Sequence, residues 1–292
     1  MKVRTPPKDN VWIHGDSVTP ADLKELSKDY GLDINILSDV LDEGELPRVE
    51  TRGEAVYVFV RMVHKGKRGK VLTSPVLLVV KDNIFANISA GELTDQRLET
   101  PGGDAHPVDT VRLMLETFAI VVSEYKELMQ QAARFIQDTG QRLRTHEVTN
   151  HDFIEFVTIE SNLNEYHMNL NSMQVVAERL QAILHTKEDN EAVEDILLYI
   201  RQLLVSVKSY DQRITSIRNA YSTIANNVLN RRIKTLTVLT LLVALPNVFF
   251  GMYGMNLDLP YQGEPWAYVM VVSATALIVF GVFWVLRKRG IF

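Results

Sequence analysis

The sequence contains no cysteine, and this absence removes a whole group of chemistries. Disulfide bonds, thiolate metal sites and cysteine nucleophiles are all excluded. The chain also lacks a Ser/His/Asp signature, a Gly-rich phosphate loop and a nucleotide-binding fingerprint, and its seven histidines form no ligand-spaced pair. The basic turn at residues 65–70 lacks the P-loop spacing, so we interpret it as a solvated hairpin turn. No enzymatic activity and no cofactor are expected.

Charge is missing from two long stretches near the C-terminus. Residues 236–252 hold no charged side chain, and residues 266–286 form a second run of 21 residues without one. A helix needs roughly 20 apolar residues to cross a bilayer core of about 30 Å. Both runs lie too far from the N-terminus to be a signal peptide. The sequence therefore predicts two transmembrane helices, at 236–256 and 266–286.

The flanks of these two spans set their expected orientation. Basic residues precede the first span at 231–234 and follow the second in the tail 287–292, whereas the loop 257–265 contains no Lys or Arg and two acids, Asp258 and Glu264. Basic residues stay on the cytoplasmic side. We expect a multi-pass protein of the cell (plasma or inner) membrane, with both termini cytoplasmic and the loop outside.

The part of the chain before the first span is acidic. It holds 25 Lys and Arg against 34 Asp and Glu up to Asn230, a formal charge of −9. This negative net charge disfavours nucleic acid as a partner and is favourable for a domain that encounters cations.

The same part predicts an α+β cytoplasmic domain. Residues 1–100 read as a small α/β part with helices near 20–30 and 34–43, and with strands at 54–63, 76–80 and 83–88. Residues 101–190 predict a hairpin of long helices, from 107 to about 145 and from 151 to 184. A stalk helix at 191–235 then continues into the first span. From Glu191 to Met252 this single helix would be roughly 90 Å long.

The first span ends in Gly254-Met255-Asn256, after Tyr253. This motif, its place after a very long helix and the basic tail behind a second span resemble the CorA family of divalent-cation channels. The stretch 104–109 is also similar to that family. The resemblance implies a homopentameric funnel whose first spans line a pore for hydrated Mg²⁺ or Co²⁺, with Gly254, Met255 and Asn256 as the selectivity filter. The divalent cation would be the substrate, and also a possible regulatory ligand.

The residues of the first span fit that role. Mg²⁺ dehydrates reluctantly, and a ring of Asn256 amides can accept hydrogen bonds from its waters, while Gly254 allows a tight backbone turn. Residues three or four positions apart along the span share one face of the helix. This face is polar at its ends, and its apolar portion, the apolar step, lies where a dewetting gate could sit. That predicted pore face consists of Asn230, Ile233, Leu236, Thr240, Ala244, Asn247 and Gly251. The apolar step is Ile233 and Leu236.

The family also implies a regulatory metal site between subunits. Asp195 on the stalk lies at the corresponding place, with Glu92 or Asp95 as its expected partner. The outer loop departs from the family's usual Met-Pro-Glu-Leu, although it keeps a Pro and an acid. A relative that moves Zn²⁺, Co²⁺ or Ni²⁺ therefore stays an alternative, and so does a membrane-anchored acidic scaffold or sensor.

Overall fold

The computed structural model describes residues 2–4, 11–66, 69–91, 98, 109–144, 150–255, 261 and 263–289. The chain divides into two compact units, Met1–Ile217 and Arg218–Phe292.

The first unit is built on a six-stranded sheet with the order β1-β2-β6-β5-β4-β3. Strands β2 and β6 pair in parallel, and the other neighbours are antiparallel. The strands are β1 (Lys2–Arg4), β2 (Val11–Gly15), β3 (Arg48–Arg52), β4 (Ala55–Lys65), β5 (Val71–Lys81) and β6 (Ile84–Ser89). The three predicted strands correspond to β4, β5 and β6. The basic turn joins β4 to β5 as a hairpin, because Lys65 pairs with Val71.

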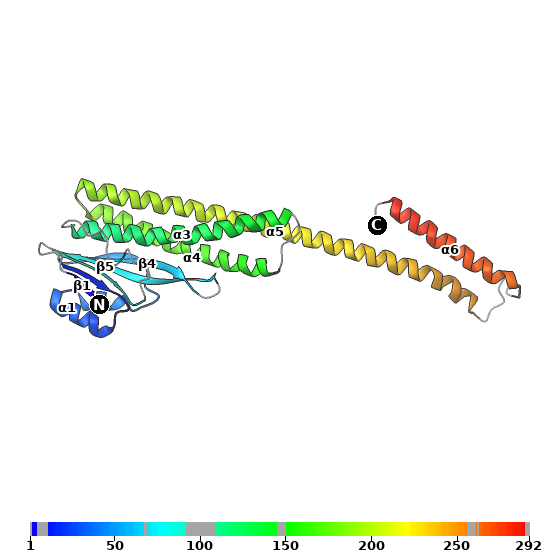
Figure 1. Cartoon of the computed structure of the whole chain (residues 1–292), viewed down its shortest axis with the longest axis horizontal. Coiled ribbons are helices and arrows are strands. Elements are labelled where there is room, and N and C mark those ends of the chain that lie inside the picture. The colour runs from blue at the N-terminus through cyan, green and yellow to red at the C-terminus, as the bar shows by residue number, and fades with distance from the viewer. Residues whose placement is uncertain are drawn as a thin grey trace. The chain divides into compact units, whose positions relative to one another are not determined.

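Side chains of the central strands are buried on both faces of the sheet. On β4, Tyr57 and Phe59 enter one core, and Val58 and Val60 enter the other. Helices α1 (Pro20–Tyr30) and α2 (Ile34–Asp39) cover the first face, and the long helices cover the second (Figure 1). Because successive side chains of a strand point to opposite faces of the sheet, β4 contributes residues to both hydrophobic cores.

Short-range signals account for the ends of the two small helices. Thr19 caps α1 in a capping box with Asp22, and Gly31 ends it in the left-handed conformation. The predicted helix at 34–43 is wrong in its length, because α2 ends at Asp39. The chain turns immediately afterwards, where the Asp42 carboxylate accepts from the Gly44 N–H at 2.8 Å.

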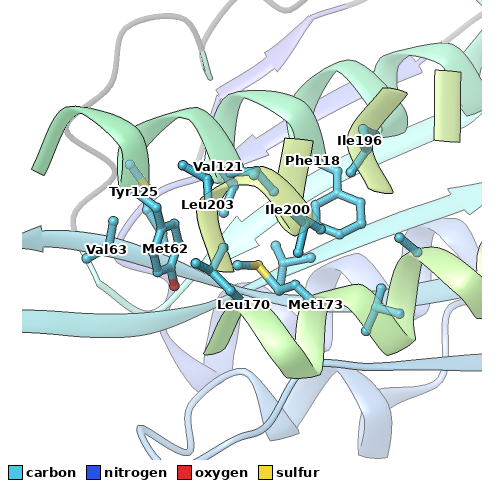
Figure 2. Packing of buried hydrophobic residues seen from close by; sticks show 14 of the residues in the cluster. Met62, Val63, Phe118, Val121, Tyr125, Leu170, Met173, Ile196, Ile200 and Leu203 are labelled. Atoms are coloured by element: carbon cyan, nitrogen blue, oxygen red, sulfur yellow. The ribbon is translucent and has the colours of Figure 1, made fainter. Parts of the chain in front are cut away.

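Three long helices form the second layer: α3 (Thr110–Arg144), α4 (Asn150–Ile183) and the first part of α5 (Lys187–Tyr253). Figure 2 shows their core, where Phe118 and Tyr125 of α3 lie among side chains of α4 and α5. The Tyr125 hydroxyl donates to the Arg61 carbonyl at 2.8 Å, which ties α3 to β4. Burial raises the pKa of Tyr125 above its ordinary value.

The second unit contains the end of α5 and the whole of α6 (Pro265–Lys288). Both helices are long and apolar enough to cross a membrane, and only 6% and 11% of their most apolar stretches are buried. Core helices of a soluble protein would be mostly buried, so exposure of this size favours contact with lipid or with other subunits. The α+β domain, the very long helix and the two C-terminal apolar helices confirm the predicted fold class.

Candidate ion-conducting site

The end of α5 has two different sides. Its shielded side is formed by side chains that are buried or half-buried: Val238, Leu242, Leu245, Pro246, Phe249 and Tyr253. All seven residues of the predicted pore face are exposed. At 3.6 residues per turn, the pore face lies opposite the shielded side. The second helix of this unit has shielded positions of its own, at Ala267 and Thr275. The pore face is thus free for contact with water or with further copies of the chain.

Polar groups on the pore face lie within the apolar stretch. The Thr240 hydroxyl donates to the Leu236 carbonyl at 2.9 Å, one turn earlier in α5. Within the described part of the chain, the Asn247 amide makes no hydrogen bond. Asn247 follows Pro246, which lacks an N–H and so leaves one helix carbonyl without its usual partner. An unpaired amide is expensive in hydrocarbon, which favours a hydrated environment for this face.

The apolar step on this face is exposed as well. Ile233 is 52% exposed and Leu236 is 64% exposed, next to the basic residues 231–234. Exposed aliphatic side chains beside a basic flank suit a constriction made by several copies, because one chain alone gives them nothing to pack against.

The motif begins at the end of α5. The Gly254 N–H donates to the carbonyls of Phe250 at 3.0 Å and Gly251 at 3.2 Å, and the Met255 N–H donates to the Met252 carbonyl at 3.3 Å. Gly254 does not adopt a positive φ. A Cβ added there would meet the Phe250 oxygen at 3.4 Å, which is ordinary contact. The turn itself therefore does not require glycine. Asn256 and Asp258 lie outside the described residues.

Glu264 caps the start of α6 without a side-chain hydrogen bond, and Pro265 occupies the first turn of that helix. The Glu264 N–H donates to the Tyr261 carbonyl at 3.0 Å. The rings of Tyr261 and Trp266 lie 5.1 Å apart. This aromatic pair and the Glu264 carboxylate occupy the same end of the helix, as an interfacial belt would require.

Asp195 lies in a different place, on the first part of α5. It lines a groove of about 690 Å³ between the beginnings of α3 and α5. Sequence reasoning missed the acids that share this groove, because they are distant in sequence or lie outside any motif: Asp109, Glu116, Glu188, Asp189 and Glu191. The predicted partners Glu92 and Asp95 fall outside the described residues.

Several of these acids already have partners. Arg112 pairs with Glu116 at 3.3 Å, and Lys187 pairs with Glu191 at 3.6 Å. Within the described residues the Asp195 carboxylate has neither a hydrogen bond nor an ion pair. No three His, Asp or Glu side chains of that part lie close enough together to hold a metal ion. A metal bound at Asp195 would therefore need ligands from elsewhere, such as a second subunit.

The fold and this site define a class of protein: a membrane protein in which an acidic α+β domain leads through one continuous helix into a two-helix membrane segment. The sequence profile of the CorA-like Mg²⁺ transporter proteins matches residues 7–288. The chain belongs to this family. The family is one of membrane transporters.

Individual relatives agree with this assignment. The chain is 23% identical over 295 residues to the cobalt/magnesium transport protein CorA of Methanocaldococcus jannaschii, covering 96% of this chain and 90% of that one. The complete structure of the CorA magnesium transporter from the same organism matches with a TM-score of 0.88, at 21% identity, over 100% of this chain and 94% of the other. The full-length CmaX protein matches with a TM-score of 0.74, at 17% identity, over 97% and 90%. These structural likenesses concern the fold.

Proposed function

We propose that the chain is one subunit of a homopentameric channel that conducts hydrated divalent cations across the cell membrane, with Mg²⁺ as the preferred ion and Co²⁺ as the second. The observation that carries the proposal is the exposed polar face at the end of α5, opposite its shielded side. Family membership supports cation transport, and the name of the archaeal relative supports these two ions.

The proposed selectivity filter is a ring of Asn256 amides at the outer mouth, held by Gly254 and Met255, with the loop acids Asp258 and Glu264 beyond it. Neutral amide oxygens accept hydrogen bonds from the waters of Mg²⁺ without removing them. Each lost hydrogen bond to a charged or polarised partner is worth roughly 1.5–3 kcal/mol. Replacing five amides by Ala should therefore reduce flux by orders of magnitude.

Uptake of Mg²⁺ into proteoliposomes tests the proposal. Wild-type protein should conduct Mg²⁺, and Asn256→Ala should assemble normally but lose flux. The same vesicles, tested with Co²⁺, Zn²⁺ and Ni²⁺, give the ion preference, so that a larger flux of Zn²⁺ or Ni²⁺ identifies the alternative relative. Native mass spectrometry in detergent counts the subunits. A monomer without flux would identify a membrane-anchored scaffold or sensor and overturn the proposal.

The proposed topology places both chain ends in the cytoplasm. Because the chain has no cysteine, a single Gln262→Cys variant gives a background-free label. It should react with an impermeant thiol reagent added outside intact cells. Reaction only after lysis contradicts this orientation.

Asp195 is the proposed regulatory ligand, acting with an acid of a neighbouring subunit such as Glu92 or Asp95. A ligand that binds the ordered state preferentially stabilises it. Mg²⁺ should therefore slow proteolysis of the cytoplasmic domain, and Asp195→Ala should weaken this protection. Glu194→Ala, next to it on the same helix and also exposed, is the matched control. If Mg²⁺ protects the wild type and the Asp195→Ala and Glu194→Ala variants equally against proteolysis, Asp195 is not the regulatory ligand.

A further inference from the structure

The basic residues of the second unit lie at one end of its two spans. Three Lys or Arg precede the first span at 231–234, and three follow the second at 287–289. The acids of this unit, Asp258 and Glu264, both lie in the loop that joins the spans. Because two spans joined by a short loop return the chain to the side from which it came, both basic groups lie at the same membrane boundary. This boundary carries positive charge without a carboxylate of its own unit.

At this boundary the last turns of α6 bring a cation onto an aromatic ring. The Lys288 Nζ lies 5.2 Å from the centroid of the Trp284 ring, within the range of a cation–π interaction. Arg287 follows Trp284 by three positions, so it lies on the same side of the helix. Both cations and Arg289 are exposed, and within the described residues they form no ion pair. The Lys288 ammonium has three N–H donors, so donors remain for an anion after one is directed at the ring.

The same side of α6 continues into the membrane as an exposed apolar strip. Leu277 is 73% exposed, Phe280 is 68% exposed and Trp284 is 56% exposed. These residues and Lys288 are three or four positions apart, so they share one side of the helix. From Leu277 to Lys288 the helix rises about 16 Å, close to half of a bilayer core of about 30 Å. Along this length the side changes from aliphatic to aromatic to cationic, which is the order in which a phospholipid presents its acyl chain, glycerol ester and phosphate.

The other end of α6 has the opposite charge. Trp266 is exposed there, and its ring lies 5.1 Å from the ring of Tyr261. The charged side chain beside it in sequence is Glu264, and the loop 257–265 contains no Lys or Arg. Tryptophan is enriched at both interfaces of a membrane, so an aromatic anchor alone does not select a headgroup. The cations beside Trp284 do select one, because they attract anionic lipids.

We propose that the exposed side of α6 around Trp284 binds an anionic phospholipid, with Arg287 and Lys288 on its phosphate and with Phe280 and Leu277 along an acyl chain. A zwitterionic lipid carries an ammonium group of its own, which competes for the phosphate. The site therefore prefers a headgroup without an ammonium group, such as phosphatidylglycerol. The apolar strip commits the site to a lipid of the bilayer rather than to free phosphate. This site requires insertion into a membrane but not ion conduction, so it goes beyond the proposed channel.

The chain has three tryptophans, so each end of α6 can be probed by fluorescence. Trp12→Phe with Trp266→Phe leaves Trp284 alone, and Trp12→Phe with Trp284→Phe leaves Trp266 as the matched control. Each protein is reconstituted in phosphatidylcholine vesicles that contain the same small fraction of either brominated phosphatidylglycerol or brominated phosphatidylcholine. Bromine quenches an indole only at short range, so quenching reports which lipid lies beside the ring.

Brominated phosphatidylglycerol should quench Trp284 more strongly than brominated phosphatidylcholine does, with a preference of about fivefold per engaged cation. The preference should fall as the salt concentration is raised, and Trp266 should show none. Arg287→Gln with Lys288→Gln should abolish the preference at Trp284, whereas Arg287→Lys with Lys288→Arg should retain it. Lys24→Gln with Lys28→Gln removes two exposed cations of α1 and should leave it unchanged. Unchanged quenching by brominated phosphatidylcholine shows that the helix of each variant is still inserted.

Equal quenching of Trp284 by the two lipids overturns the proposal. An equal preference at Trp266 also overturns it, because anionic lipid would then be enriched around the whole protein. A preference that survives the loss of both cations removes Arg287 and Lys288 from the site. A preference that inorganic phosphate abolishes, while chloride at the same ionic strength does not, assigns these cations to free phosphate instead of a lipid.

Discussion

Asn247 offers one substitution whose effects on thermal stability and on Mg²⁺ flux differ between a channel and a membrane anchor. Its side chain is exposed on the pore face, within the apolar end of α5, and within the described residues it makes no hydrogen bond. If that side faced lipid, the amide would be unpaired in hydrocarbon. Asn247→Leu would then remove a cost of about 1–3 kcal/mol per chain, judged from mutational data on buried polar groups. In a water-filled lumen the amide is hydrated, and the substitution removes no such cost.

The assay combines thermal unfolding in detergent with Mg²⁺ flux in proteoliposomes. For a lumen we expect no gain in the unfolding midpoint and a loss of flux, because five apolar side chains replace five amides in the ion path. For a lipid-facing position, a stabilisation of about 1–3 kcal/mol would raise the midpoint by several degrees, on the scale of about 2–4 °C per kcal/mol.

The matched control is Leu239→Asn. Leu239 is exposed on α5 outside the pore face, so an amide introduced there should lower the midpoint. A stabilised Asn247→Leu variant with wild-type flux would refute the assignment of this face to the pore.

Three further outcomes follow from the same structure. Ile233→Ser should wet the constriction and raise basal Mg²⁺ flux, whereas Leu239→Ser should not; equal flux in both means that Ile233 packs against a neighbour instead. Phe118 is fully buried among the long helices, so Phe118→Ala should destabilise the protein by about 3–5 kcal/mol in denaturant titrations, against less than about 0.5 kcal/mol for the exposed Met168→Ala. Burial lowers the pKa of His64 below 6.5, so its contribution to stability is present above pH 6.5 and is lost as the pH falls below it; His64→Asn should flatten this part of the stability curve, and an unchanged curve would contradict it.

Local patterns in the sequence were enough for several parts of the fold. The hairpin between β4 and β5 and the three long helices depend on residues close together in sequence, and the structure confirms them. The two apolar spans also follow from composition alone, because hydrocarbon imposes a minimum length and excludes charge. The family could be expected from the motif at 254–256, once its place after the long helix was recognised.

Other elements could not be predicted, because their stability comes from distant partners. Strands β1, β2 and β3 have only three to five residues each, too few for a clear alternation. Strand β2 belongs to the sheet because it pairs in parallel with β6, where Val11 lies opposite Ile84. The groove beside Asp195 likewise arises only when the beginnings of α3 and α5 come together.

The sequence by itself determined which residues of α5 share a side, because helical periodicity is a local property. It could not decide which side of the helix stays open. Tertiary packing decided that: Val238 and its neighbours on one side of the helix are shielded, and the side that carries Thr240 and Asn247 is left exposed. The burial of a side chain depends on which residues pack against it in space, and helical periodicity alone does not identify those residues.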